Sequence, residues 1–258
     1  GGIFATYFAL FWTELPHYLL LLLMFLAGML GGGLWGLIPA YFKIKFGTNE
    51  TLFTLMLNYI ALYMIKYLTE GPWRDPSSSG FPMIASFDKN ARLDLIFGVH
   101  AGWLIALLLT VILYIYLKYS KHGYEISVVG ESVNTARYAG MNVKKIVLRT
   151  MFISGAICGM AGMIQVSGAA HTLGEGVAGG VGFTAIIVAW LAKLNPLIIL
   201  IVTLFFAVLE KGSSVMQSTY GLSQSVSSIL QGIILFTVLG MDFFTRYRIV
   251  FRKARKKL

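Results

Sequence analysis

Residues 118–168 read KYSKHGYEISVVGESVNTARYAGMNVKKIVLRTMFISGAICGMAGMIQVSG, and the rest of the chain is best interpreted outward from them. The first half of this stretch is polar and basic and stands between two apolar runs that are each long enough to cross a membrane, so it must lie in water. Within it, Ser132 is a suitable N-cap, residues 134–138 can form a helical turn, and Gly140 with Asn142 can end it. A segment that only joined two spans would not need such a helix.

The composition of the whole chain is that of an integral membrane protein. Of 258 residues, 57% are hydrophobic and 12% are charged, and the mean hydropathy is +0.75, which is more apolar surface than one soluble core can bury. The apolar runs are long and continuous, whereas a membrane barrel needs short segments of alternating polarity. The sequence therefore predicts an all-α fold, a polytopic membrane helix bundle with about six full spans plus a half-helix.

The sequence predicts a single transmembrane domain over residues 1–258. We interpret residues 1–13 as the tail of a span whose beginning is absent, and 70–94, rich in proline and turn formers, as a solvated connection. A glycine-rich stretch precedes the half-helix and allows irregular backbone there. Because such backbone is tolerated at membrane depth only where protein or a cavity surrounds it, we expect this segment to be buried in protein or to line a cavity. The six spans are expected at 17–42, 49–69, 95–117, 146–167, 195–209 and 229–244, and the half-helix at 181–191.

Two spans carry glycines at helical spacing. Gly28, Gly32 and Gly36 fall on one face of their helix, and a second set, at 155, 159 and 162, lies on the fourth span. Small residues at this spacing let membrane helices approach closely. We expect both sets to serve helix packing rather than ligand binding.

A stripe of polar residues predicts a solute pathway. Glu50, Thr54 and Asn58 stand four residues apart on one face of the second span, and polar groups in hydrocarbon should face protein or a water-filled path. Asn58, nearer mid-span, favours the pathway, while Thr54 fits interhelical hydrogen bonding equally well. The other candidates for the pathway are Ser154, Gln165 and Phe183.

The basic residues predict an orientation. If the spans alternate, 119–145 and the basic tail 246–258 share one side of the membrane, which collects all but five of the 21 Lys and Arg residues. By the positive-inside rule this side is the cytoplasm, so the C-terminus is cytoplasmic. The net charge of +10 then follows from topology and requires no nucleic acid.

Several chemistries lack their motifs. The sequence has no phosphate-binding G-x-x-x-x-G-K-[ST], no H-E-x-x-H and no Cys or His pairs at metal spacing, so we expect no enzyme activity, no metal and no cofactor. Gly174, Gly176 and Gly179 match G-x-G-x-x-G without a preceding strand, which makes the match accidental. His171 and Glu175 are too few ligands for a metal. Mid-span positions almost lack carboxylates, which disfavours an ion-coupled carrier.

Three groups of residues resemble the permease subunits of ABC importers in the branched-chain amino acid and simple-sugar superfamily, and most closely the nucleoside-type permeases. The first group resembles the family's cytoplasmic coupling loop, the second a signature of the nucleoside-type members, and the third a segment around the half-helix. The first comprises Gly130, Glu131, Asn134, Ala136, Arg137, Gly140, Ser154–Ala156, Gly159, Ala161 and Gly162; the second Gly47–Glu50 and Thr54–Tyr59; the third Gly182, Phe183, Ile186, Val188, Ala189, Asn195 and Pro196.

The resemblance implies a function and a set of partners. It implies a transport subunit in the bacterial plasma membrane, bound by lipid, that moves a neutral solute, a nucleoside by preference, while a separate ATPase hydrolyses ATP. A second permease subunit, identical or related, and an extracytoplasmic solute-binding protein complete the assembly. The residues implied to contact the ATPase are Glu131, Asn134, Arg137 and Tyr138, with Ala136 and Gly140 kept small for fit.

Other functions stay open at this point. Simple sugars and branched-chain amino acids are moved on the same scaffold, and a stand-alone secondary transporter would also show a half-helix and glycine breaks. A carrier that works alone would not need a structured docking helix. Family members also have upstream spans and a glycine-rich signature ending in Glu-Gly-Gln, neither of which occurs in this sequence.

Overall fold

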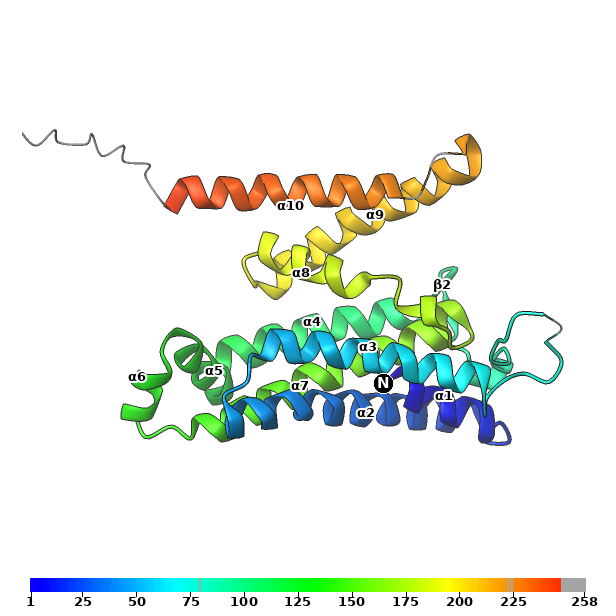
Figure 1. Ribbon diagram of the computed structural model, residues 1–258, viewed down its shortest axis with the longest axis horizontal. Helices are drawn as coiled ribbons and strands as arrows, with labels where there is room; N and C mark the ends of the chain where they lie inside the picture. Colours follow the sequence, from blue (N-terminus) through cyan, green and yellow to red (C-terminus); the bar gives the residue numbers. More distant parts are fainter. Residues whose placement is uncertain (79, 222, 224, 247–258) are drawn as a thin grey trace, which may run out of the picture. The chain divides into compact units, whose positions relative to one another are not determined.

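A computed structural model describes residues 1–258 except 79, 222, 224 and 247–258 (Figure 1). The chain forms two compact units, residues 1–179 and 180–258. The helices of unit 1 are α1 (Gly2–Phe11), α2 (His17–Phe46), α3 (Glu50–Glu70), η1 (Lys89–Ala91), α4 (Gly102–Tyr119), α5 (Lys121–Glu131), α6 (Val133–Tyr138), α7 (Val143–Ile164), the π-helical turn η2 (Gln165–Ala170) and η3 (Glu175–Ala178). Unit 2 contains α8 (Val181–Leu191), α9 (Pro196–Tyr220) and α10 (Ser225–Arg246).

The all-α membrane fold is confirmed. Within the described part of the chain, five helices are long and apolar enough to cross a membrane: α2, α3, α4, the continuous 143–170 and α9. The sixth expected span lies inside α10, which is not among these five. The half-helix has the expected bounds, and Gly179 and Gly180 before it take positive φ angles of 51° and 75°. Of the predicted basic tail, only Arg246 belongs to the described residues.

Gly28, Gly32 and Gly36 of α2 meet Gly155 and Gly159 of α7, whereas Gly162 approaches Gly2 of α1. A Cβ on Gly159 would overlap the carbonyl oxygen of Gly28 and stand 3.0 Å from the Cα of Gly32. A Cβ on Gly36 would stand 2.8 Å from the carbonyl oxygen of Met151. The two backbones therefore touch, as the spacing of the glycines predicts.

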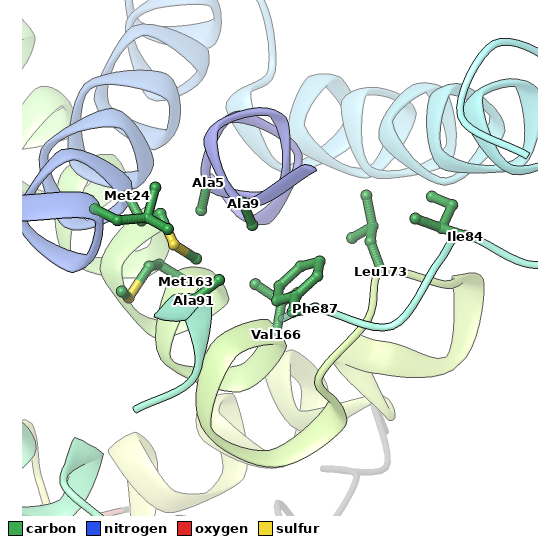
Figure 2. Close-up of a cluster of buried hydrophobic side chains, with 10 residues drawn as sticks. Ala5, Ala9, Met24, Ile84, Phe87, Ala91, Met163, Val166 and Leu173 are labelled. Atoms are coloured by element: carbon green, nitrogen blue, oxygen red, sulfur yellow. The ribbon is translucent and has the colours of Figure 1, made fainter. Parts of the chain in front are cut away.

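The connection after α3 is largely exposed, as the sequence suggested, but part of it packs against the helices. Its side chains Ile84, Phe87 and Ala91 are buried with residues of α1, α2, α7 and the turns that follow α7, and Figure 2 shows this cluster. The backbone N–H of Phe87 donates to the carbonyl of His171, 2.8 Å away. His17, at the start of α2, reaches the Asn90 carbonyl oxygen at 2.9 Å. This packing could not be predicted from the local sequence, because the contacts join segments that are far apart in the chain.

The third span begins later than expected. Residues 95–100 form a two-stranded hairpin, β1 (Leu95–Ile96) and β2 (Val99–His100), and α4 starts at Gly102. The turn residues Phe97 and Gly98 both have positive φ, 56° and 79°, as tight antiparallel hairpins require. The span was expected to begin at Leu95 because most residues of this stretch are apolar, which is typical of a membrane span and does not indicate a turn.

The helix after the half-helix is longer than expected. Asn195 caps α9 by accepting from the backbone N–H of Leu197 at 3.1 Å, so the helix begins where the span was expected, but it continues through the polar stretch to Tyr220. It ends at Gly221, whose φ is 69°. Serine side chains can bond to helix carbonyls, as Ser218 does to Val215 at 2.9 Å, so polarity alone did not end the helix.

One buried hydrogen bond should contribute measurably to the stability of unit 1. The Ser167 hydroxyl is fully buried and donates to the carbonyl oxygen of Ala91 over 2.6 Å. Ser167→Ala leaves that buried carbonyl without its partner, and we expect a loss of about 1–2 kcal/mol in thermal unfolding of the detergent-solubilised protein. The control is Ser218→Ala at an exposed hydroxyl, and an unchanged midpoint for Ser167→Ala would contradict the assignment.

Candidate functional site

The polar segment between α4 and α7 is folded into two capped helices. The Ser120 hydroxyl accepts from the Gly123 N–H at 3.0 Å and begins α5, and the Ser132 hydroxyl accepts from the Thr135 N–H at 3.3 Å and begins α6. Gly140, with φ 74°, ends α6. Asn142, expected to help end this helix, instead caps α7 by accepting from the Lys145 N–H at 3.1 Å. The short helix predicted from the sequence is present as α6.

The six predicted coupling residues differ in exposure. Glu131, Asn134, Arg137 and Tyr138 are exposed, and Tyr138 reaches 93%. Ala136 is fully buried against its own chain, so its small size serves the packing of α6. Gly140 has open space where a Cβ would stand, so its positive φ is what favours glycine there.

A groove of about 770 Å³ lies beside α6. It is formed by the end of α2, the start of α3, α5, α6 and the start of α7, and its charged lining residues are Lys43, Glu50, Arg137 and Lys144. Lys43 and Glu50 form an ion pair across the turn between α2 and α3. Glu50, predicted as a pathway residue, thus lies in the same groove as Arg137, predicted as a coupling residue.

An ion pair joins α5 to α7. An Arg149 Nη donates to a Glu125 carboxylate oxygen at 2.8 Å, and both side chains are half-buried. The hydrogen bond from Arg149 holds the pKa of Glu125 below its ordinary value of 4.5, and the positive charges of Arg149, His122 and Lys121 act in the same direction. Because the folded pKa is lowered, the pair is intact above pH 4.5 and is lost as the pH falls through the folded value.

The predicted pathway residues are spread over both units. Thr54 and Asn58 are exposed on α3, and the Thr54 hydroxyl donates to the Thr51 carbonyl of its own helix at 3.0 Å. Ser154 and Gln165 are exposed on α7 and η2. Phe183 is 61% exposed on α8 and belongs to unit 2. In unit 1 these positions present polar groups outward from α3 and α7.

A pocket of about 270 Å³ lies between α1, α2, α3 and α7 in unit 1. Two of its lining residues lie on the same helix faces as predicted pathway residues. Ala61 is three residues after Asn58 on α3, and Cys158 is four residues after Ser154 on α7. Trp35 and Met64 also line it, and no motif in the sequence singles them out. The one feature of the sequence that could have indicated Trp35 is its position next to Gly36, in the part of α2 that packs closely against α7.

His171 has a local structural role. One ring nitrogen lies 3.0 Å from the carbonyl oxygen of Ser167, one turn earlier, and the residue itself has a φ of 54°. Its carbonyl receives the N–H of Phe87. Among the described residues, no group of three or more His, Cys, Asp or Glu side chains is placed to hold a metal ion.

Comparison with known proteins gives one family and several relatives. The family model described as branched-chain amino acid transport system / permease component matches residues 1–239. The chain is 31% identical to the glucose ABC transporter permease protein of Haloferax volcanii, over 92% of this chain and 66% of the relative. It is 31% identical to the guanosine ABC transporter permease protein of Bacillus subtilis, over 94% and 70%.

A third relative extends this set. The nucleoside ABC transporter permease protein of Lactococcus lactis is 28% identical over 92% of this chain and 68% of its own length. The chain therefore spans about two thirds of the length of these relatives, between 66% and 70%. No solved structure matches it significantly.

Proposed function

The chain belongs to the family of branched-chain amino acid transport system / permease components, and from this premise we propose that it is the membrane-spanning subunit of an ABC importer. A separate ATPase subunit hydrolyses ATP, and a second permease subunit and an extracytoplasmic solute-binding protein complete the assembly. The observation that carries the proposal is α6, a capped helix that presents exposed side chains outside the membrane-spanning helices.

The helix α6 is the contact with the ATPase. A segment that only connected α4 to α7 would not need a capped helix with a buried side chain, yet α6 is capped and Ala136 is buried. A docking surface requires fixed side chains, because ordering a flexible loop on binding costs affinity. The exposed residues Glu131, Asn134, Arg137 and Tyr138 form this surface.

The end of unit 1 that carries α5 and α6 faces the cytoplasm. This end holds Lys43, Lys45, Lys121, Lys144 and Lys145 on the last turn of α2 and the first turns of α5 and α7. The opposite end, with the connection after α3, holds fewer basic residues: Lys66, Arg74, Lys89 and Arg92. Figure 1 shows α5 and α6 at one end of the long helices and that connection at the other. The distribution supports the assignment by the positive-inside rule.

The solute is a neutral, ring-shaped molecule, a nucleoside by preference. None of the side chains lining the pocket between α1, α2, α3 and α7 is charged, and Phe4 and Trp35 offer aromatic surface to a flat ring. Relatives named for guanosine and nucleosides support this substrate class. The relative named for glucose favours a simple sugar as the alternative. Competition of labelled guanosine uptake by unlabelled glucose separates the two.

Uptake with and without the ATPase tests the proposed function. In membrane vesicles that contain the permease assembly, we expect ATP-dependent solute uptake only when the ATPase subunit is co-expressed. Equal uptake in its absence would favour a stand-alone carrier, which is the second candidate because the glycine break before the half-helix α8 also occurs in such carriers.

The exposed amide of Asn58 should take part in solute passage. Asn58→Leu removes a polar group from the pathway face of α3, and we expect uptake to fall about tenfold, since a lost hydrogen bond to a solute corresponds to roughly 1.5 kcal/mol. Association with the ATPase should not change, because α6 is untouched. Asn58→Gln keeps the amide and serves as the control. Unchanged uptake by Asn58→Leu would assign this residue to packing.

A further inference from the structure

A second, smaller pocket of about 220 Å³ lies where the first turns of α5 and α7 meet. It is lined by Lys121, His122 and Glu125 of α5, by Lys145, Ile146 and Arg149 of α7, and by the cap residue Asn142. Three permanent cations therefore share the pocket with one carboxylate. A concave site with an excess of positive charge attracts a compact anion.

The carboxylate does not neutralise the lysines. Glu125 is already bonded to Arg149 at 2.8 Å. Within the part of the chain that the structure describes, neither the Lys121 nor the Lys145 ammonium makes an ion pair or a hydrogen bond. These two ammonium groups are therefore available to a ligand that the chain does not supply.

Two buried polar atoms beside the pocket also lack a partner among the described residues. The Nε of Arg149 is buried without a hydrogen bond, so the guanidinium uses few of its five donors. The hydroxyl of Tyr116 is buried without one as well, and its ring contacts the His122 ring, with centroids 6.0 Å apart. Buried polar groups without partners are rare in native proteins, and a water or ion that is not part of the chain is one explanation.

The pocket lies next to the ends of two helices that are long and apolar enough to cross a membrane, which is where lipid headgroups are expected. The membrane-spanning helix α4 ends at Tyr119, one residue before the cap of α5, and the spanning helix α7 begins at Val143. Tyr119 and Tyr124 are 70% and 64% exposed at this level. Tyrosine is enriched where the hydrocarbon meets the headgroups, and buried Ile146 forms the apolar floor of the pocket.

We propose that the pocket between α5 and α7 binds the phosphate of an anionic phospholipid headgroup, held by Lys121 and Lys145. A free phosphate offers the same chemistry but lacks the acyl chains that would lie along the adjoining membrane-spanning helices. The bound headgroup ties the first turn of α5 to that of α7, so lipid composition influences the segment that leads into α6. This site is separate from the solute pocket and does not depend on which solute is carried.

The test measures lipid binding to the purified full chain in neutral detergent. Native mass spectrometry titrates phosphatidylglycerol, phosphatidylcholine and, separately, inorganic phosphate. We expect phosphatidylglycerol to bind at least tenfold more tightly than phosphatidylcholine. Each lysine near an anionic headgroup contributes about fivefold, so Lys121→Gln with Lys145→Gln should weaken phosphatidylglycerol binding about 25-fold.

The controls isolate the pocket. Lys144→Gln removes the same charge from the neighbouring residue, which lines the other groove, and should leave binding within about twofold. Lys121→Arg with Lys145→Arg keeps the charges and should retain binding, which excludes loss through misfolding. Equal binding by the Gln double variant and the unmodified chain would overturn the proposal, as would equal affinity for inorganic phosphate.

One further outcome identifies a different occupant. If phosphatidylglycerol does not bind selectively, while the Gln double variant releases the ATPase, then the two lysines meet acidic side chains of a partner protein and the lipid assignment is wrong. If the Gln double variant loses phosphatidylglycerol but keeps the ATPase and its solute uptake, the lipid site stands independently of the transport function.

Discussion

Arg137→Glu should lower ATP-driven uptake at least tenfold while the protein reaches the membrane in normal amount. Arg137 is exposed on α6, lines the groove of about 770 Å³ and makes no ion pair among the described residues. In the proposed docking of α6 on the ATPase, the reversal places a negative charge where the partner receives a positive one. Breaking a desolvated charge pair at an interface costs about 2–5 kcal/mol, and 1.4 kcal/mol already corresponds to tenfold.

The expected defect is specific to α6, the proposed coupling helix. Arg74→Glu makes the same charge change in the connection after α3, which Figure 1 shows at the other end of the long helices from α6, and should leave ATPase association intact. Co-purification of the ATPase with each variant, together with uptake in vesicles, gives the measurement. Tyr138→Ala is a suitable second variant, because it removes a side chain that is 93% exposed, whereas a substitution of Gly140 would strain a backbone with φ 74°. Full association and uptake in both Arg137→Glu and Tyr138→Ala would refute the coupling role.

The local signals in the sequence were sufficient for the helices that carry them. Ser132 caps the helix that the sequence assigned to it, and Asn49 and Asn195 cap helices that begin where spans were expected, because a cap depends only on residues within one turn. The half-helix at 181–191 has the predicted bounds for the same reason, since glycines with positive φ precede it. The glycine spacing predicted that each of these helices approaches a neighbour closely, which is a property of each helix face taken alone, but not that α2 and α7 are each other's neighbour.

Features that depend on distant residues could not be predicted. The burial of Phe87 requires contacts with α7 and with the turn at His171, and nothing in the local sequence distinguishes it from an exposed loop aromatic. The hairpin at 95–100 has an apolar turn residue, Phe97, where turn statistics favour polar ones. For the candidate site, the sequence selected the residues of α6 but not Trp35, whose place in a pocket arises only when α2, α3 and α7 assemble.

Gly159→Leu should prevent the stable packing of α2 against α7. Even one added carbon at this position would overlap the Gly28 carbonyl oxygen, so the four carbons of a leucine side chain have no room. The obstacle is backbone on both sides, which cannot move away as the end of a flexible side chain can. The two helices must therefore separate along the contact that also includes Gly32, Gly36 and Gly155.

The loss should lie at or above the upper end of the about 1–3 kcal/mol that overpacking costs in a well-packed core. We expect Gly159→Leu to lower the yield of folded protein and the midpoint of thermal unfolding in detergent. Gly232→Leu is the matched control: it introduces the same side chain in a long helix, α10, at a glycine with no atom within 4 Å of the added Cβ. Gly159→Ala should give an intermediate defect, because its single methyl group already meets the Gly28 carbonyl. If Gly159→Leu unfolded at the same temperature as Gly232→Leu, the direct contact of the two backbones could not be the main source of the stability of unit 1.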